Sequence, residues 1–470
     1  MLQTLKNAWR TKEIRSKILF TLFILLLYRI GTVVPVPFVD ANNFAGQFQG
    51  TILDYMNILS GGSLGTATLF ALGVSPYINS SIIIQLLSVV FPKLGELAKN
   101  DKKKMNFITR IVTVALALVT AIGYYFLLAK NMMLTNAAIK GEGKPYWFYA
   151  IVIIACYCAG ASLVMWLAER INEHGIGNGI SIILFANIIS SLPSMFYQLF
   201  LLCYNTFFYE SVFWYAFVAI LFSLIFVAIT IASVVFVVWV TGSERRIPIQ
   251  YAKRAVGRKM YGGQSSKLPI KLNMTGVMPV IFASSIVSLV PTILALCNVD
   301  GEGDTFWDGV ARFVGSDGFV YPILLFVLII AFAYFYTQIT FDPIEVANNL
   351  KKQGGAINGI RQGRPTSEYI RKILNKITLA GALFLSIIAV VPVIAGPHVV
   401  QHILEWLRSG WYAADQVSSN WKSIEAYAQQ LSGVFTFGGT SLIIVVGVVL
   451  ETFRELEAQL TMRNYKGFLN

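Results

Sequence analysis

Residues 212–240 read VFWYAFVAILFSLIFVAITIASVVFVVWV, a run without a single charged side chain. A helix needs about 20 apolar residues to cross the hydrocarbon core of a bilayer, so this run predicts a membrane-spanning helix. The next segment, residues 241–273, carries eight basic residues and one acidic residue, Glu244. A basic loop directly after an apolar run indicates that the helix ends on the cytoplasmic side.

The same apolar pattern recurs along the whole chain. Of its 470 residues 56% are hydrophobic and 13% charged, too few charges to cover the surface of a soluble protein of this size. Arg29 is the one charge well inside an apolar run. We therefore predict an all-α integral membrane protein with ten transmembrane helices, and we exclude a soluble enzyme. The ten windows are residues 18–36, 69–91, 110–129, 146–168, 180–202, 212–240, 274–297, 319–341, 374–396 and 434–452.

The distribution of basic residues predicts the orientation of these helices. Thirty of the 37 Lys and Arg residues lie in the N-terminal segment and in the segments after even-numbered windows, and six lie after odd-numbered windows. By the positive-inside rule both termini are cytoplasmic. The basic N-terminus precedes an apolar run, as in a signal peptide. That run ends in Val-Pro-Val-Pro-Phe at 34–38, which is no cleavage site, so we expect a retained first helix.

The apolar windows contain few side chains that could bind an ion or catalyse a reaction. No Asp, Glu or His lies well inside one, which argues against the main alternative function, a secondary transporter that binds a coupling ion. Arg29 lies toward the outer end of its window, where it can snorkel or pair. No phosphate-binding loop, no cysteine pair with metal or redox spacing and no catalytic constellation stands out. We expect neither an enzyme nor a cofactor.

His398 and His402 are four residues apart in a predicted external loop, and Glu405 follows them. On a helix these side chains would share a face and form a candidate zinc site. Val399, Ile403 and the Trp406-Leu407 pair instead indicate an amphipathic helix at the membrane interface. We favour the amphipathic helix and expect no metal.

A short apolar segment, residues 52–59, lies in the first external loop and is followed by Ser60-Gly61-Gly62-Ser63. It is too short to cross the membrane and too apolar for an exposed loop. A re-entrant helix in a protein-lined cavity and a helix lying flat on the outer surface both fit.

Two long basic loops, residues 241–273 and 342–376, are predicted on the cytoplasmic side. In the second loop Arg361 lies between Gly359 and Gly363, so we expect it at the tip of a turn. One alternative is that these charges serve only to fix the topology and to contact anionic lipid. Loops of this length with interleaved Tyr and Arg favour a docking surface for a partner, including ribosomal RNA phosphates. The candidate docking residues are Arg245, Arg246, Lys253, Arg254, Arg258, Lys259, Arg361 and Arg364.

These loops and several helices carry motifs of a known family. The chain closely resembles the SecY family, the central subunits of bacterial protein-translocation channels. The matching motifs run in family order over nearly the whole chain, in loops and helices alike. They are YRIG at 28–31, LSGGS at 59–63, FALGVSPYI at 70–78, EHGIGNGIS at 173–181, ERRI at 244–247, YAKR at 251–254, KLNMTGVMP at 271–279, NNLKK at 348–352, GIR at 359–361 and FGGTSL at 437–442.

The resemblance implies a channel of two inverted five-helix halves, residues 1–205 and 206–470, that open like a clamshell. It implies that residues 53–66 form a re-entrant plug, here called the plug segment. Its candidate residues are Leu53, Tyr55, Met56, Ile58, Leu59, Ser60, Gly61 and Gly62. It also implies a ring of aliphatic side chains at the waist, here called the pore ring. Its members are Val74, Ile78, Ile180, Leu184, Ile281 and Ile444.

The family's partners follow from the same resemblance. The basic loops would dock the motor ATPase SecA and the translating ribosome, SecE would clamp the halves and SecG would attach at the periphery. Signal peptides and nascent polypeptides would pass the pore or leave into lipid through a lateral gate between helices two and three and helices seven and eight. Gln85 is a candidate polar gate residue, with an ordinary interhelical hydrogen bond as the alternative. The expected location is the bacterial cytoplasmic membrane.

One segment departs from the family pattern. The external loop at residues 397–433 is longer than expected and contains the His pair together with Trp406, Trp411 and Trp421. We assign it surface contact at the outer leaflet.

Overall fold

Long helices dominate the structure, as the apolar runs predict. The computed structural model describes residues 2–39, 57, 60–130, 134, 146–209, 213–251, 254–256, 259–261, 265–296, 309–310, 320–411 and 439–466. Every one of the ten predicted windows overlaps a helix. These helices are α2 (Lys12–Gly31), α4 (Ser75–Val90), α6 (Lys102–Lys130), α8 (Tyr146–His174), α9 (Gly179–Tyr209), α10 (Phe213–Gly242), α11 (Met278–Leu296), α13 (Val320–Thr340), α15 (Arg364–Trp411) and α17 (Thr440–Lys466).

Not all of these helices are equally suited to cross a membrane. Within the described residues, four stretches are long and apolar enough: those in α6, α8 and α15 and the one from α13 into α14 (Pro343–Lys352). A fifth consists of α4 and α5 (Pro92–Asn100), which are bent by 118° relative to each other. The structure therefore describes a multi-helix membrane bundle, and the count of ten crossings stays a prediction.

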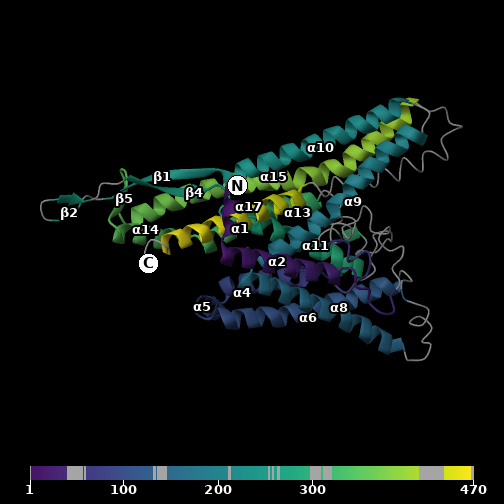
Figure 1. Ribbon diagram of the computed structural model, residues 1–470, viewed down its shortest axis with the longest axis horizontal. Helices are drawn as coiled ribbons and strands as arrows, with labels where there is room; N and C mark the ends of the chain where they lie inside the picture. Colours follow the sequence, from purple (N-terminus) through teal and green to yellow (C-terminus); the bar gives the residue numbers. More distant parts are fainter. Residues whose placement is uncertain are drawn as a thin grey trace.

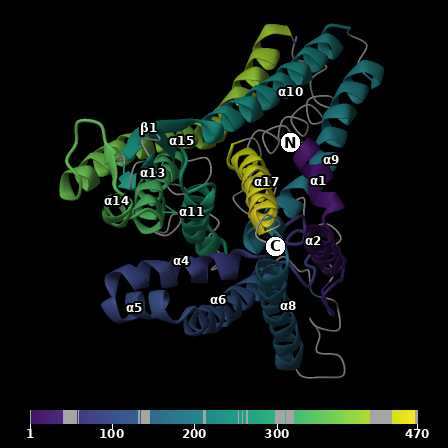
Figure 2. The same ribbon diagram turned by 60° about the vertical axis from the view of Figure 1, so that its left-hand side comes forward.

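The helices pack around α11 and α17 (Figures 1 and 2). The α11 helix contacts α4 and α6 on one side and α13 and α15 on the other. The α17 helix contacts α9, α10, α11 and α15, and its far end contacts α1 (Leu2–Arg10). The main hydrophobic cluster lies where α4, α9, α11 and α17 meet. This arrangement brings the first and second parts of the chain together around one apolar centre.

The prediction of helices alone is wrong for the basic loops, which form strands. β1 (Glu244–Tyr251) pairs antiparallel with β4 (Ser265–Lys271) and with β5 (Gly355–Ile357), in the order β4-β1-β5. A separate hairpin consists of β2 (Arg254–Val256) and β3 (Lys259–Tyr261). In β1, Ile247 and Ile249 are buried while their neighbours are exposed, the alternation typical of a half-covered strand. A search for long apolar runs could not detect so short a pattern.

The sheet has a small hydrophobic core of its own. Ile247, Ile249 and Ile270 pack against Ile357 of β5 and Ile370 near the start of α15. Ile270 and Ile370 have no exposed surface. Both basic loops are thus parts of one folded unit, which lies together with α5 and α14 toward one end of the bundle (Figure 1).

Several helix boundaries differ from the predicted windows, and two of these differences concern predicted site residues. The window 69–91 becomes helical only at Ser75, because residues 69–74 form turns and Pro76 occupies the first helical turn, where its missing N–H is tolerated. The window 374–396 continues as helix to Trp411. His398 and His402 therefore lie in the last part of α15, and residues 412–433 of the predicted external loop lie outside the described residues.

The core of the sheet yields a stability prediction. Ile270→Ala removes the central apolar side chain of β4, and we expect a loss of about 2–5 kcal/mol in the local stability of this unit. Limited trypsin digestion of native membranes should cleave the basic loops of the variant faster. Lys267→Arg, on the exposed side of the same strand, keeps the trypsin site and is the control, which should leave the cleavage rate unchanged. Equal rates for both variants would contradict the described packing.

Candidate functional site

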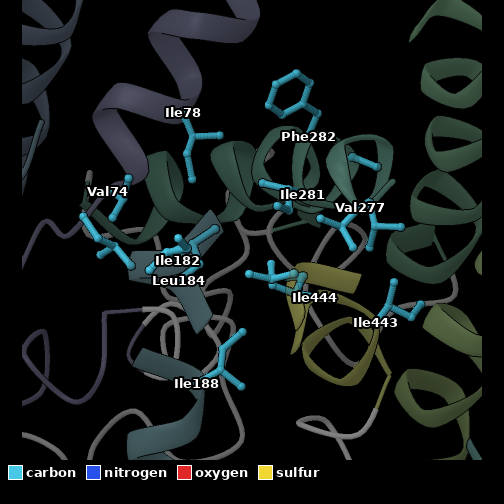
Figure 3. Packing of buried hydrophobic residues seen from close by; sticks show 14 of the residues in the cluster. Val74, Ile78, Ile182, Leu184, Ile188, Val277, Ile281, Phe282, Ile443 and Ile444 are labelled. Carbon is cyan, nitrogen blue, oxygen red and sulfur yellow. The ribbon is translucent and has the colours of Figure 1, made fainter. Parts of the chain in front are cut away.

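The residues predicted for the pore ring lie at the centre of the main hydrophobic cluster. Val74 directly precedes α4, Ile78 lies in its first turns, Leu184 is on α9, Ile281 on α11 and Ile444 on α17. These five side chains are between 1% and 3% exposed. Figure 3 shows side chains from all four helices directed toward one another. Ile180, the sixth, is partly buried and packs against the same cluster.

Four of the six predicted ring residues border one cavity. Ile78, Leu184, Ile281 and Ile444 line a cavity of about 70 Å³. Val74 and Ile180 do not line it, although Leu72 and Ser75 on either side of Val74 do. Aliphatic walls offer water no hydrogen bonds, so a constriction built from them dewets and resists ions. They also offer a passing polypeptide no fixed polar partner.

Hydroxyl groups line another part of the same cavity. Ser284, Ser288 and Thr292 lie on α11 beyond Ile281. The hydroxyl of Ser284 donates to the Ile281 carbonyl at 2.9 Å, and that of Ser288 donates to the Ser285 carbonyl at 3.0 Å. Because these hydroxyls are satisfied by their own helix, they can border water without holding a side chain of a passing polypeptide.

The end of the plug segment borders this cavity. Ser60 and Leu64 line it, and the Leu64 carbonyl accepts a hydrogen bond from the Tyr124 hydroxyl of α6. The Ser60 hydroxyl donates to the Asn57 carbonyl at 2.9 Å. The position of Ser60 and Leu64 favours the re-entrant interpretation over a helix flat on the surface. Of the predicted plug residues, Ser60, Gly61 and Gly62 are described, while Leu53, Tyr55, Met56, Ile58 and Leu59 lie outside the described residues.

A polar contact between α2 and α9 lies beside this segment. One Arg29 guanidinium nitrogen donates to the Ala186 carbonyl at 2.9 Å, so Arg29 binds a neighbouring helix. The side-chain amide of Asn187 donates to the Tyr28 hydroxyl, also at 2.9 Å. Asn187 is fully buried and was not among the residues predicted from sequence. A search of the apolar windows for amides, and not only for Asp, Glu and His, would have found it.

Gln85 lies where α4 approaches α13. The Tyr336 hydroxyl of α13 donates to the Gln85 side-chain carbonyl, and the Gln85 amide nitrogen donates to the Ser81 hydroxyl at 3.3 Å. Tyr336 also contacts the ring of Phe282 on α11, with ring centroids 5.1 Å apart. The candidate gate residue therefore makes a hydrogen bond across the seam between the first and second parts of the chain.

The basic loops present their charges on the shared sheet. Arg245 and Arg246 of β1 are exposed, and Arg246 forms an ion pair with Glu244 at 2.7 Å. Arg254 and Lys259 lie on the β2–β3 hairpin, and Lys253 and Arg258 lie outside the described residues. At the base of the sheet, burial and, to a smaller extent, the nearby Arg454 lower the pKa of Lys271.

Arg361 is exposed at a tip, as the flanking glycines predict. Gly359 and Gly363 adopt φ values of 77° and 97°, which strongly favour glycine. The Arg361 carbonyl accepts a hydrogen bond from the Thr366 hydroxyl at 2.8 Å, which fixes the turn. Arg364 forms an exposed ion pair with Glu368 at 3.1 Å. Within the described part of the chain no ion pair involves Arg361.

Candidate metal ligands do not converge in the described residues. They contain no group of three or more His, Cys, Asp and Glu side chains that could hold an ion. His398 and His402 share the end of α15, and their role stays a prediction.

Comparison with known proteins identifies the family. A family model for SecY matches residues 68–453, which include the described pore-ring residues and both basic loops. The chain belongs to the SecY family. The SecY translocase subunit of Streptomyces galbus is 39% identical over 480 aligned residues, and that of Mycobacterium tuberculosis (strain ATCC 25618 / H37Rv) is 39% identical over 488. Both alignments cover the two chains completely.

Solved structures agree at the level of the fold. A protein-conducting channel covers 94% of this chain and 92% of its own at 17% identity, with a TM-score of 0.57. A SecY structure whose plug domain stabilises the closed state matches with a TM-score of 0.58 at the same identity and coverage. Sec61 in a canine ribosome–channel complex matches with a TM-score of 0.54 at 15% identity. The resemblance noted in the sequence is confirmed, and with it the function of a multi-pass channel subunit of a protein translocase. The family is not one of enzymes.

Proposed function

We propose that this SecY-family chain passes unfolded secretory polypeptides across the bacterial cytoplasmic membrane and releases transmembrane segments sideways into lipid. The observation that carries this proposal is the aliphatic constriction bordered by the plug segment. Ile78 and Leu184 come from the first part of the chain, and Ile281 and Ile444 come from the second. A pore at this interface widens when the two parts, residues 1–205 and 206–470, move apart as halves of a clamshell.

The sideways exit follows from the seam between these halves. The α4 and α6 helices on one side face α11 and α13 on the other, and α11 contacts both α4 and α6. We assign the lateral gate to this seam, with the Gln85–Tyr336 hydrogen bond as one of its closing contacts. A signal peptide that enters the seam would replace this bond by contacts of its own.

The motor that drives transport would be a separate protein bound to the basic loops. The exposed Arg361 turn follows β5, which pairs with the arginine-bearing strand β1, so we assign both loops to one docking surface, here proposed for SecA and for the ribosome in turn. The orientation is supported by the 30 basic residues on the predicted cytoplasmic side. A contact between the two ends of the chain also supports a common side for both termini, since Lys17 of α2 donates to the Gln459 side chain of α17 at 3.2 Å. We further propose SecE as a clamp around the two halves and SecG as a peripheral subunit.

Cross-linking to an arrested precursor tests the channel. Single cysteines at Ile281 and Ile444, in a chain without its four native cysteines, should cross-link to a secretory polypeptide halted midway through the membrane. A cysteine at Val449, which is 47% exposed on α17 and directed away from the cluster, is the control and should not react. Equal cross-linking at all three positions, or none at either ring position, would contradict the proposal.

Charge reversal tests the docking surface. Arg361→Glu should lower motor-driven translocation about tenfold or more, because an exposed arginine at the centre of an interface often carries a large share of the binding energy. Lys103→Glu, an exposed charge on α6 away from the sheet, makes the same change in net charge and should have little effect. Unchanged translocation by Arg361→Glu would refute the assigned role.

A further inference from the structure

Asn187 is a buried amide in the otherwise apolar first half of α9. It follows the pore-ring residue Leu184 by three positions and so lies on nearly the same face of the helix. Burying an amide is unfavourable unless hydrogen bonds compensate it. Asn187 makes such a bond to the Tyr28 hydroxyl, although an aliphatic side chain would have avoided the penalty altogether. The position of this amide therefore calls for an explanation beyond packing.

The surrounding contacts fix the amide and a neighbouring charge in place. Tyr28 is fully buried and stacks on Phe70, with ring centroids 5.4 Å apart. Arg29 follows Tyr28, and its guanidinium is held by the carbonyl of Ala186, the residue before Asn187. Two consecutive residues of α2 thus hold two consecutive residues of α9. The Asn187 amide and the Arg29 guanidinium are therefore held in place independently of the plug segment.

Gly61 of the plug segment lies directly against these two polar groups. A Cβ atom added to Gly61 would lie 2.8 Å from the side-chain oxygen of Asn187 and 3.1 Å from a guanidinium nitrogen of Arg29. Gly61 also has a φ of +69°, a conformation that favours glycine. The next residue, Gly62, has a φ of +87°, yet a Cβ there would meet no atom within 4 Å. The close approach is therefore specific to Gly61.

We propose that Asn187 and Arg29 form a latch that holds Gly61, and with it the end of the plug segment, against the closed pore ring. This inference rests on the proposed channel function and names positioning residues for its closed state. The latch contacts exist only while the segment is seated, so they favour the closed state selectively. The contacting parts of α2 and α9 both belong to residues 1–205, so Asn187 and Arg29 stay together during opening while the plug segment moves away from them.

The resting ion conductance of the full-length channel complex in planar bilayers tests the latch. Asn187→Ala removes the side chain that contacts Gly61 and should raise this conductance at least about twofold, because a contact made only in the closed state is lost. Ser190→Ala is the matched control, because Ser190 is exposed on the same helix and its hydroxyl donates to the Asn187 carbonyl of its own backbone. The control should remain as tight as the unmodified channel. Equal conductance of the two variants would overturn the proposal.

The two glycines provide a second, independent comparison. Gly61→Ala and Gly62→Ala both place an alanine at a positive φ, but only the first introduces a clash with Asn187. Gly61→Ala should therefore leak more than Gly62→Ala. In an Asn187→Ala background the difference between the two substitutions should shrink, because the nearer of the two clashing groups is gone and only Arg29 remains. Equal leakage of the two single variants would also overturn the latch.

Failure of the latch and failure of the proposed function are separable. Translocation of an ordinary precursor by the unmodified channel, together with cross-links at Ile281 and Ile444, reports on the channel itself. A channel that translocates but gains no leak from Asn187→Ala contradicts the latch alone. A channel without ring cross-links contradicts the proposed function, whatever its conductance.

Discussion

A channel for polypeptides must close against ions and yet bind none of the side chains that pass through it. An apolar constriction meets both demands, since it dewets when narrow and forms no directional hydrogen bonds when wide. In the proposed channel Ile78, Leu184, Ile281 and Ile444 supply the constriction from four helices. The remainder of the bundle positions these side chains, and the proposed division of the chain into two parts would allow the constriction to widen.

Polar groups are placed so that they do not compromise this constriction. Hydroxyls of α11 bond to carbonyls of their own helix. Gln85 and Tyr336 pair across the seam, where their contact can be exchanged for an entering helix. Asn187 and Arg29 lie against Gly61 of the plug segment. Arg361, which forms no ion pair among the described residues, is exposed in the turn after β5, where water solvates its charge.

Sequence reasoning predicted the features that depend on long patterns. Each apolar window overlaps a helix, because roughly 20 consecutive apolar residues are a strong signal. The glycines around Arg361 likewise predicted its tip, because left-handed φ values depend on local residue type. The pore-ring residues came from the family resemblance. Their burial and their shared cavity are features that composition alone could not supply.

Other features depend on contacts between distant residues, and the local sequence pattern indicates them only weakly. The pairing of β1 with β5 joins residues more than 100 positions apart, and Ile247 and Ile249 give only a short alternation. Neither Tyr336, the partner of Gln85, nor the approach of Gly61 to Asn187 can be read from spacing. Ile180 matched the family motif, but a helical turn separates it from Leu184, which lines the cavity.

The central claim is that Ile78 and Ile281 face one another across a pore that must widen for transport. Cysteines at both positions, joined by a short reducible cross-linker, test it most directly through the rate of precursor translocation. We predict that the cross-linked channel is blocked, that reduction restores transport, and that either single cysteine variant transports with or without the reagent. Undiminished translocation through the cross-linked channel would contradict the account.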